Sequence, residues 1–221
     1  IFAVITGPVS YMLCLLFAWI INEFNRGMRT LLTLIFYAPS ICGNAYMVWN
    51  LILTGDRYGY LNGILLNLDI INEPILWMKT EQYVMPMLII VQLWLSLGTG
   101  FLSFIAGLQT VDKSMYEAAA IDGIKNRWQE LWYVTLPYMR PQMVFSAIMS
   151  ITGAFSVGDQ ITALCGYPTQ DYIAHTLILH IQDYGGSRME MGYACALATV
   201  LFFLMIVCNK LAQKLISKVG D

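Results

Sequence analysis

Polar side chains recur at helical spacing inside long apolar stretches of this sequence, and the chemistry open to them is hydrogen bonding. One set within residues 84–108 follows the spacing i, i+4, i+7 and i+11: Gln92, Ser96, Thr99 and Ser103. A second set within 142–165 is spaced nearly the same way: Thr152, Ser156, Asp159 and Thr162. A third set is less regular: Tyr37, Ser40, Asn44 and Met47.

These polar faces are expected to turn away from lipid, because contact between polar atoms and hydrocarbon costs free energy. Two readings stay open. The side chains can bond neighbouring helices or their own backbone, or they can line a shared aqueous path for a polar solute. The residues that would line such a path are Asn44, Gln92, Ser96, Thr99, Thr152, Ser156 and Asp159.

The sequence lacks the residue patterns expected of metal binding, disulfide bonding, nucleotide binding or catalysis. His175 and His180 are five residues apart, which misses the i, i+4 spacing of two metal ligands on one helical face, so we expect exposed, solvated histidines and no metal. The five cysteines are scattered without a CxxC pair, which argues against a disulfide scaffold or a metal cluster. The sequence has no GxxxxGK[ST] phosphate loop and no recognisable catalytic framework. We therefore expect no catalytic residue and no cofactor.

The composition indicates a membrane protein. Of 221 residues, 58% are apolar and 12% are charged, against about 25% charged in an ordinary soluble domain. The net charge of −2 offers no positive field for nucleic acid, which excludes that class of partner.

A membrane helix needs about 20 mostly apolar residues. Five stretches meet this length: 1–22, 30–54, 84–108, 142–165 and 191–209. The fold predicted is all-α, a polytopic transmembrane helix bundle forming one domain over 1–221.

The distribution of basic residues predicts the orientation of these spans. Nine of the twelve Lys and Arg fall on the side that follows the first span, and basic flanks stay cytoplasmic. We therefore expect residues 109–141 and the C-terminus in the cytoplasm, and residues 55–83 and 166–190 outside. The chain opens on Ile1 inside an apolar run, and we expect it to be an N-terminally truncated piece.

The connection 109–141 predicts two short helices. Asp112 is a plausible N-cap, residues 113–121 favour a helix, and Gly123 can supply the left-handed stop. A second helical piece over 125–134 is expected to end before Pro137, because proline disfavours helical geometry in the residue that precedes it. Taken alone, this connection is equally well read as an interfacial segment against lipid headgroups.

The residues of this connection resemble the EAA loop of ABC-importer permease subunits. They are Glu117-Ala118-Ala119, Asp122-Gly123, Thr135-Leu136-Pro137 and Pro141. The flanking stretches 106–109 and 191–198 resemble the carbohydrate-uptake branch, typified by the maltose permeases. Asp112 and Ile124 stand where the family usually has Pro and Ala, and Leu131 and Val134 replace a common Phe and Ile. The stretch between Gly123 and Leu136 is one residue longer than the commonest form, which puts the docking register in question.

The resemblance implies a permease subunit of an ATP-driven importer for a sugar or oligosaccharide, with its first span absent from this chain. Residues 113–123 would form a coupling helix on a cytoplasmic ATPase subunit, through Glu117, Ala118, Ala119, Ala120, Asp122 and Gly123. The implied partners are a second permease subunit, two cytoplasmic ATP-binding subunits, an extracellular or periplasmic solute-binding protein, and the lipid bilayer. The implied location is a bacterial or archaeal cytoplasmic membrane, and ATP hydrolysis would belong to the partners.

Alternatives remain open at two levels. An ion-gradient-driven secondary transporter would tend to show more intramembrane acids and broken helices, and a noncatalytic membrane scaffold would show no coupling to ATP.

Asp159 is the one charge inside a predicted span, six residues from its outer end and about 9 Å deep at ~1.5 Å per residue. It could reach the outer headgroups, contact a sugar, or bond a neighbouring helix.

Overall fold

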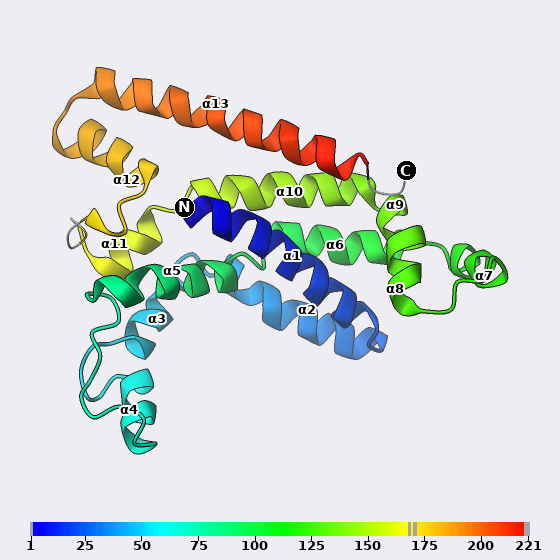
Figure 1. Ribbon diagram of the computed structural model, residues 1–221, viewed down its shortest axis with the longest axis horizontal. Helices are drawn as coiled ribbons and strands as arrows, with labels where there is room; N and C mark the ends of the chain where they lie inside the picture. Colours follow the sequence, from blue (N-terminus) through cyan, green and yellow to red (C-terminus); the bar gives the residue numbers. More distant parts are fainter. Residues whose placement is uncertain (1, 168, 170–171, 219–221) are drawn as a thin grey trace. The chain divides into compact units, whose positions relative to one another are not determined.

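The computed structural model describes residues 2–167, 169 and 172–218, and in that part of the chain it contains helices and no strand. The predicted all-α class is confirmed. Figure 1 traces the elements in chain order. They are α1 (Phe2–Asn22), α2 (Arg26–Ile41), α3 (Met47–Ile52), α4 (Tyr60–Asn67), α5 (Glu81–Leu95), α6 (Thr99–Thr110), α7 (Lys113–Ile121), α8 (Arg127–Glu130), the π-helix η1 (Leu131–Thr135), α9 (Leu136–Tyr138), α10 (Arg140–Phe155), α11 (Asp159–Cys165), α12 (Leu177–Gln182), the π-helix η3 (Asp183–Ser187) and α13 (Met191–Ile216).

Two of the described helices, α1 and α13, are each long and apolar enough to cross a membrane. The pairs α5 with α6 and α10 with α11 are interrupted, and counting each pair as one span gives up to four. The predicted span 30–54 is divided into α2 and α3 by non-helical residues 42–46, with Pro39 inside α2 and Gly43 in the break. The count of five spans therefore stays a prediction.

The interruptions fall where glycine permits non-helical backbone. Gly98 precedes α6 with φ −111° and ψ −136°, and Gly158 precedes α11 with φ −136° and ψ −62°. Ser96 and Ser156 lie in these two breaks. A strict helical period therefore does not run through either predicted span.

The chain forms two compact units, each with its own apolar core. Unit 2 comprises residues 7–41, 96–153 and 204–221. Its core contains Cys14, Ala18, Ile21, Leu97, Phe101, Phe104, Ile105, Leu108, Leu131, Leu136, Met139, Met143, Ala147 and Ile216. Within it, Gly100 of α6 lies so close to α10 that a Cβ there would stand 2.9 Å from Oγ of Ser146. Small residues at helix contacts permit this kind of approach.

Unit 1 comprises residues 1–6, 42–95 and 154–203. Its core contains Phe2, Leu53, Trp77, Val84, Leu88, Val91, Val157, Ile161, Leu164, Ala174 and Leu179. The segment between α3 and α5 is organised around Asn62, which is fully buried. The Asn62 amide donates to the carbonyls of Thr54, Asp56 and Ile75, and its side-chain oxygen accepts from Ile75 N and Trp77 Nε1.

Candidate functional site

The helix predicted over 113–121 is present as α7, and it ends as its sequence indicates. Gly123 has φ +93°, its N–H donates to the Ala120 carbonyl, and Ile124 N–H donates to the Ala119 carbonyl. These two bonds form the Schellman arrangement, in which a left-handed glycine closes the last helical turn. Asp112 stands at the N-cap position without a side-chain capping bond.

The residues expected to contact an ATPase are mostly exposed in this chain. Glu117, Ala118, Ala120, Asp122 and Gly123 are exposed, whereas Ala119 is only 5% exposed. The outward flank of α7 therefore carries Ala118 and Ala120 rather than the whole alanine run. Next to them, Ile121 is 87% exposed. These exposed residues are therefore small or apolar, apart from the two carboxylates of Glu117 and Asp122.

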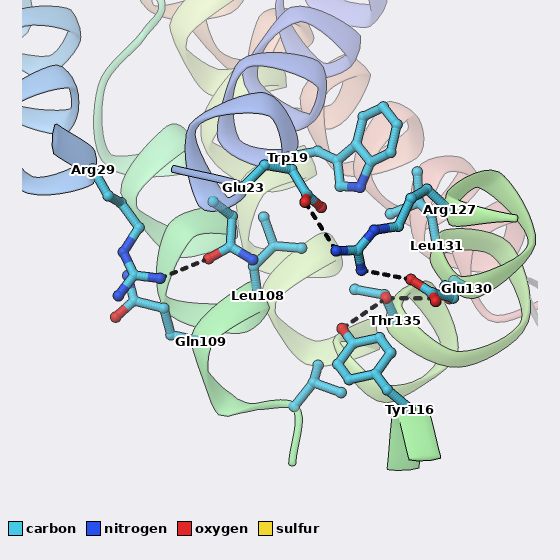
Figure 2. A pocket seen from close by; sticks show the side chains of 12 residues that line it. Trp19, Glu23, Arg29, Leu108, Gln109, Tyr116, Arg127, Glu130, Leu131 and Thr135 are labelled. Atoms are coloured by element: carbon cyan, nitrogen blue, oxygen red, sulfur yellow. Dashed lines mark hydrogen bonds and ion pairs between the residues drawn. The ribbon is translucent and has the colours of Figure 1, made fainter. Parts of the chain in front are cut away.

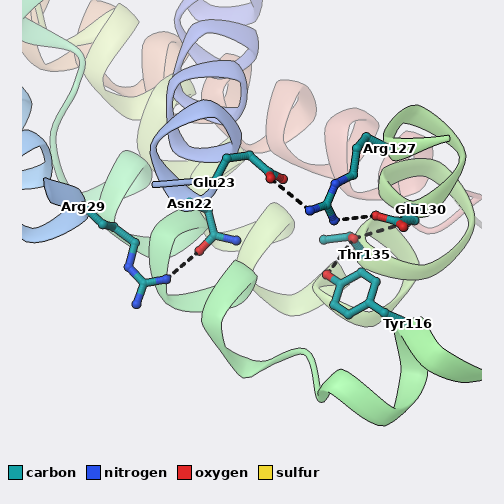
Figure 3. A network of polar contacts seen from close by, with 7 residues as sticks. All are labelled: Asn22, Glu23, Arg29, Tyr116, Arg127, Glu130 and Thr135. Atoms are coloured by element: carbon teal, nitrogen blue, oxygen red, sulfur yellow. Dashed lines mark hydrogen bonds and ion pairs between the residues drawn. The ribbon is translucent and has the colours of Figure 1, made fainter. Parts of the chain in front are cut away.

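The inward face of α7 is bound to η1 through Tyr116. Its hydroxyl lies 3.0 Å from Oγ1 of Thr135, a residue that is 3% exposed (Figure 3). The Thr135 hydroxyl donates to the Glu130 carbonyl at 3.2 Å. Because that carbonyl can only accept, Thr135 uses its proton there and Tyr116 is the donor in the bond between the two side chains.

The prediction that the second helical piece ends before Pro137 is wrong. Helical backbone runs through α8, η1 and α9 to Tyr138. In η1 the N–H of Leu136 donates to the Leu131 carbonyl, five residues back. A proline in a regular α-helix lacks the N–H for its own bond and clashes with the carbonyl four residues earlier. The wider π-turn precedes Pro137, which then stands near the start of α9.

A polar cavity of about 400 Å³ lies beside this segment within unit 2 (Figure 2). It is lined by Trp19, Asn22, Glu23, Arg29, Leu108, Gln109, Val111, Tyr116, Arg127, Glu130, Leu131 and Thr135. Two arginines and two glutamates contribute to it. Arg29 Nη1 donates to Oδ1 of Asn22 at 3.1 Å.

Arg127 connects two carboxylates in this cavity. Its Nη2 lies 3.1 Å from Oε2 of Glu23 and its Nη1 lies 2.7 Å from Oε2 of Glu130. The hydrogen bond with Glu130, followed by the charge of Glu23, raises the pKa of Arg127. Beside this contact the rings of Trp19 and Trp128 stand 4.7 Å apart. The sequence analysis did not identify Arg127 as a functional residue. One signal was available: Glu23 follows the end of α1, whose last turn has no basic residue, so a cation from elsewhere in the chain could be expected beside it.

The residues predicted to line a solute path do not form continuous helical stripes. Ser96 and Ser156 lie in breaks, and so does Asn44, whose Oδ1 accepts a hydrogen bond from Tyr46 at 3.0 Å. Asn44, Gln92, Ser156 and Asp159 belong to unit 1, whereas Ser96, Thr99 and Thr152 belong to unit 2. The predicted stripes require uninterrupted helices, and the glycine-containing breaks interrupt them.

Individual path residues differ in burial. Gln92 of α5 is buried and accepts a hydrogen bond from the Gln160 amide of α11. Thr99 is exposed at the start of α6, and Thr152 is half-buried in α10. Asp159 is exposed and is the first residue of α11, so the depth expected from a continuous helix does not apply to it.

The expectation of exposed, solvated histidines is wrong. His175 and His180 are both half-buried, and Nε2 of His175 lies 3.3 Å from Nδ1 of His180. The i, i+4 spacing applies only within one helix, and α12 begins at Leu177, after His175. In the described part of the chain no group of three or more His, Cys, Asp or Glu is placed to hold a metal ion.

Comparison with known proteins identifies the family. Residues 8–219 match the family described as binding-protein-dependent transport system inner membrane component. The arabinooligosaccharides transport system permease protein AraP of Bacillus subtilis is 30% identical over 203 residues, covering 91% of this chain and 64% of AraP. The lactose transport system permease protein LacF of Rhizobium radiobacter is 27% identical, covering 95% of this chain and 70% of LacF. The chain thus spans about two thirds of the length of these relatives.

A solved structure shares the fold. A chain of a bacterial ABC transporter involved in the import of the acidic polysaccharide alginate aligns with a TM-score of 0.81 and 19% identity, covering 99% of this chain and 78% of that one. The match to the family extends over α1 to α13, including the α7–η1 segment. The chain therefore belongs to the family of binding-protein-dependent transport system inner membrane components.

Proposed function

We propose that the chain is the transmembrane permease subunit of an ATP-driven importer for a sugar or oligosaccharide, and that α7 is its coupling helix. The observation that carries this proposal is the construction of α7. It is a short helix closed by a left-handed Gly123, it exposes Glu117, Ala118 and Ala120, and it is bound on its other face to η1. Its relatives include permeases named for arabinooligosaccharides and lactose.

In this function α7 lies in a groove of an ATP-binding subunit. Glu117 pairs with a basic group there, and the small side chains of Ala118 and Ala120 permit close approach. When two such subunits close on ATP, the coupling helices of two permeases approach each other and the bundle changes from inward-open to outward-open. ATP hydrolysis then belongs to the partner subunits and not to this chain.

The remaining partners follow from the same proposal. They are a second permease subunit and a periplasmic or extracellular solute-binding protein. The similar alginate transporter has also been solved in complex with its pentasaccharide-bound periplasmic protein, which supports the latter. The chain would lie in a bacterial or archaeal cytoplasmic membrane with residues 109–141 and the C-terminus in the cytoplasm. Asn44, Gln92, Ser96, Thr99, Thr152, Ser156 and Asp159 remain the proposed path residues.

The test is uptake by the complete transporter in proteoliposomes, with the full-length protein, its partner subunits and a sugar panel that includes lactose and arabinotriose. Gly123→Val should strain a positive-φ position and uncouple ATP hydrolysis from uptake, and Glu117→Lys should do so by charge reversal. Gly27→Val is a matched control, because Gly27 also has open space around it but no positive φ.

Wild-type coupling in both α7 variants would refute the coupling role. The interrupted helices are a feature expected of a secondary transporter, so that alternative needs its own measurement. Accumulation of sugar by the purified subunit alone, under an ion gradient and without ATP, would support it against this proposal.

A further inference from the structure

The end of α1 carries a charge that its own helix disfavours. Glu23 directly follows Asn22, the last residue of α1, and the last turn of that helix contains no basic residue. The C-terminal end of a helix is the negative end of its dipole, so a carboxylate there is unfavourable and a cation is favourable. Arg127, more than a hundred positions later in the sequence, supplies the cation 3.1 Å from Glu23.

The geometry of this contact suits an arginine. One terminal nitrogen of Arg127 faces Glu23 while the other faces Glu130 at 2.7 Å, so a single planar group joins α1 to α8. A lysine ammonium is a compact point charge and does not present two donors in this fixed fork. The contact between Trp19 and Trp128 adds an apolar connection between the same two elements.

Glu130 also belongs to the connection with α7. Its carbonyl accepts the Thr135 hydroxyl, which in turn accepts from Tyr116 of α7, while its carboxylate binds Arg127 (Figure 3). The described contacts therefore run from α7 through η1 and α8 to α1. In the chain order α7 lies between α6 and α8, so α1 is not its neighbour in sequence. These noncovalent contacts therefore link α7 to α1, which is a candidate membrane span.

We infer that Arg127 is a positioning residue that makes α1 move together with α7 when the ATP-binding subunits close. This inference rests on the proposed function. The ion pair is solvent-exposed, with the side chains of Arg127 and Glu23 64% and 43% exposed, so it contributes little to folding stability. Its removal should therefore change coupling while leaving the fold intact.

The first measurement needs no transported solute. In the complete transporter, with native cysteines replaced, spin labels are placed at two exposed positions outside the proposed ATPase-contacting residues, Ile20 of α1 and Met115 of α7. Because α1 and α7 move together, their separation should stay narrow and unchanged between the nucleotide-free and the ADP-vanadate-trapped states. In Arg127→Gln the separation should shift or broaden on trapping. Lys125→Gln, which removes an exposed positive charge two residues away, should behave as wild type.

The second measurement is a double-mutant cycle on uptake per ATP hydrolysed. Arg127→Gln and Glu23→Gln should each lower this ratio by about two- to five-fold, the loss that corresponds to one solvent-exposed ion pair. The double variant should be no worse than the more affected single variant, because both remove the same contact. Arg127→Lys should rescue incompletely.

The inference is overturned if the label distances respond to trapping identically in wild type and Arg127→Gln, or if the two single losses multiply in the double variant. These outcomes are separable from failure of the proposed function. Uncoupling by Gly123→Val with normal behaviour of Arg127→Gln would refute only the role of Arg127. Normal coupling in both Gly123→Val and Glu117→Lys would refute the role of α7 itself.

Discussion

Tyr116 donates a hydrogen bond to Thr135, and this contact of 3.0 Å joins the exposed helix α7 to a buried hydroxyl in a π-helix. Thr135 is therefore both an acceptor for α7 and a donor to the turn on which Arg127 stands. A single buried hydroxyl thus connects two elements that the chain alone leaves free to move apart.

The first prediction concerns this hydroxyl. Thr135→Val keeps the shape but removes both bonds, and loss of a hydrogen-bonding partner at a buried group costs about 1–3 kcal/mol. Amide hydrogen exchange in residues 113–121 should accelerate. Tyr116→Phe should have a smaller effect, since Thr135 retains its bond to Glu130. Tyr133→Phe, at an exposed position, is the control. Unchanged exchange in Thr135→Val would show that the bond does not hold α7.

The second prediction concerns Asn62. Asn62→Leu should lower the free energy of unfolding of unit 1 by about 1–3 kcal/mol for each group left unpaired. The Trp77 indole N–H is the clearest such group, because it bonds to Asn62 at 2.8 Å and its residue is buried. Asn62→Asp keeps an acceptor for Trp77, but its second oxygen replaces the amide donor opposite three carbonyl acceptors and buries a charge, so it should destabilise unit 1 at least as much. Thermal unfolding in detergent measures both.

Asn67→Leu serves as the control for this series, because Asn67 is exposed at the end of the same helix α4. An equal loss of stability in Asn67→Leu and Asn62→Leu would contradict the organising role given to Asn62.

The third prediction concerns the contact between α6 and α10. A valine at Gly100 would place its Cβ 2.9 Å from Oγ of the buried Ser146, so either this side chain would have to move or the two helices would have to separate. Overpacking of this kind costs about 1–3 kcal/mol. Gly153→Val in α10 is the control, because its Cβ would meet nothing within 4 Å. A melting temperature in Gly100→Val equal to that of the control would rule out the close approach.

The fourth prediction concerns pH and His175. Burial, followed by the charge of His180, lowers the pKa of His175. Asp183 acts in the opposite direction, and Arg188 adds to the lowering. His175 in the unfolded segment therefore binds a proton more readily than in the folded segment. The folded segment is fully favoured at pH values above the ordinary histidine pKa of about 6.5, and it loses stability as the pH falls below that value.

Hydrogen exchange in residues 172–187, corrected for the intrinsic pH dependence, should therefore show weaker protection at pH 5 than at pH 7.5. His175→Gln should remove most of this difference. Persistence of the full difference in that variant would assign it to another group.

Local sequence signals predicted α7 well, because its start, its alanine run and the stop at Gly123 each depend on a few neighbouring residues. The interruptions before Gly98 and Gly158 were not predicted. The sequences around them are apolar enough for a continuous span, and in lipid glycine is tolerated inside helices, so composition does not decide between a bent and a straight helix. The predicted stripes depended on that choice and were lost with it.

The contacts of the candidate site were harder to predict than its helices. Glu23 and Arg127 are far apart in sequence, and their pairing depends on how α1 packs in unit 2. In the sequence Thr135 stands out only as part of a motif, since a hydroxyl in a predicted helix gives no sign of its tertiary partner. His175 and His180 meet because the backbone between them leaves the helix, which residue spacing alone does not reveal.

The π-helix η1 also has an evolutionary meaning. A π-turn holds one residue more than an α-turn, and the resemblance to EAA loops predicts one extra residue between Gly123 and Leu136. Such a turn lets a lineage gain or lose a single amino acid without rebuilding the helices on either side. Relatives with a shorter loop should then keep the contacts of Thr135 and Arg127 with a regular α-turn between them, and length variation in this loop would be tolerated at η1 before anywhere else.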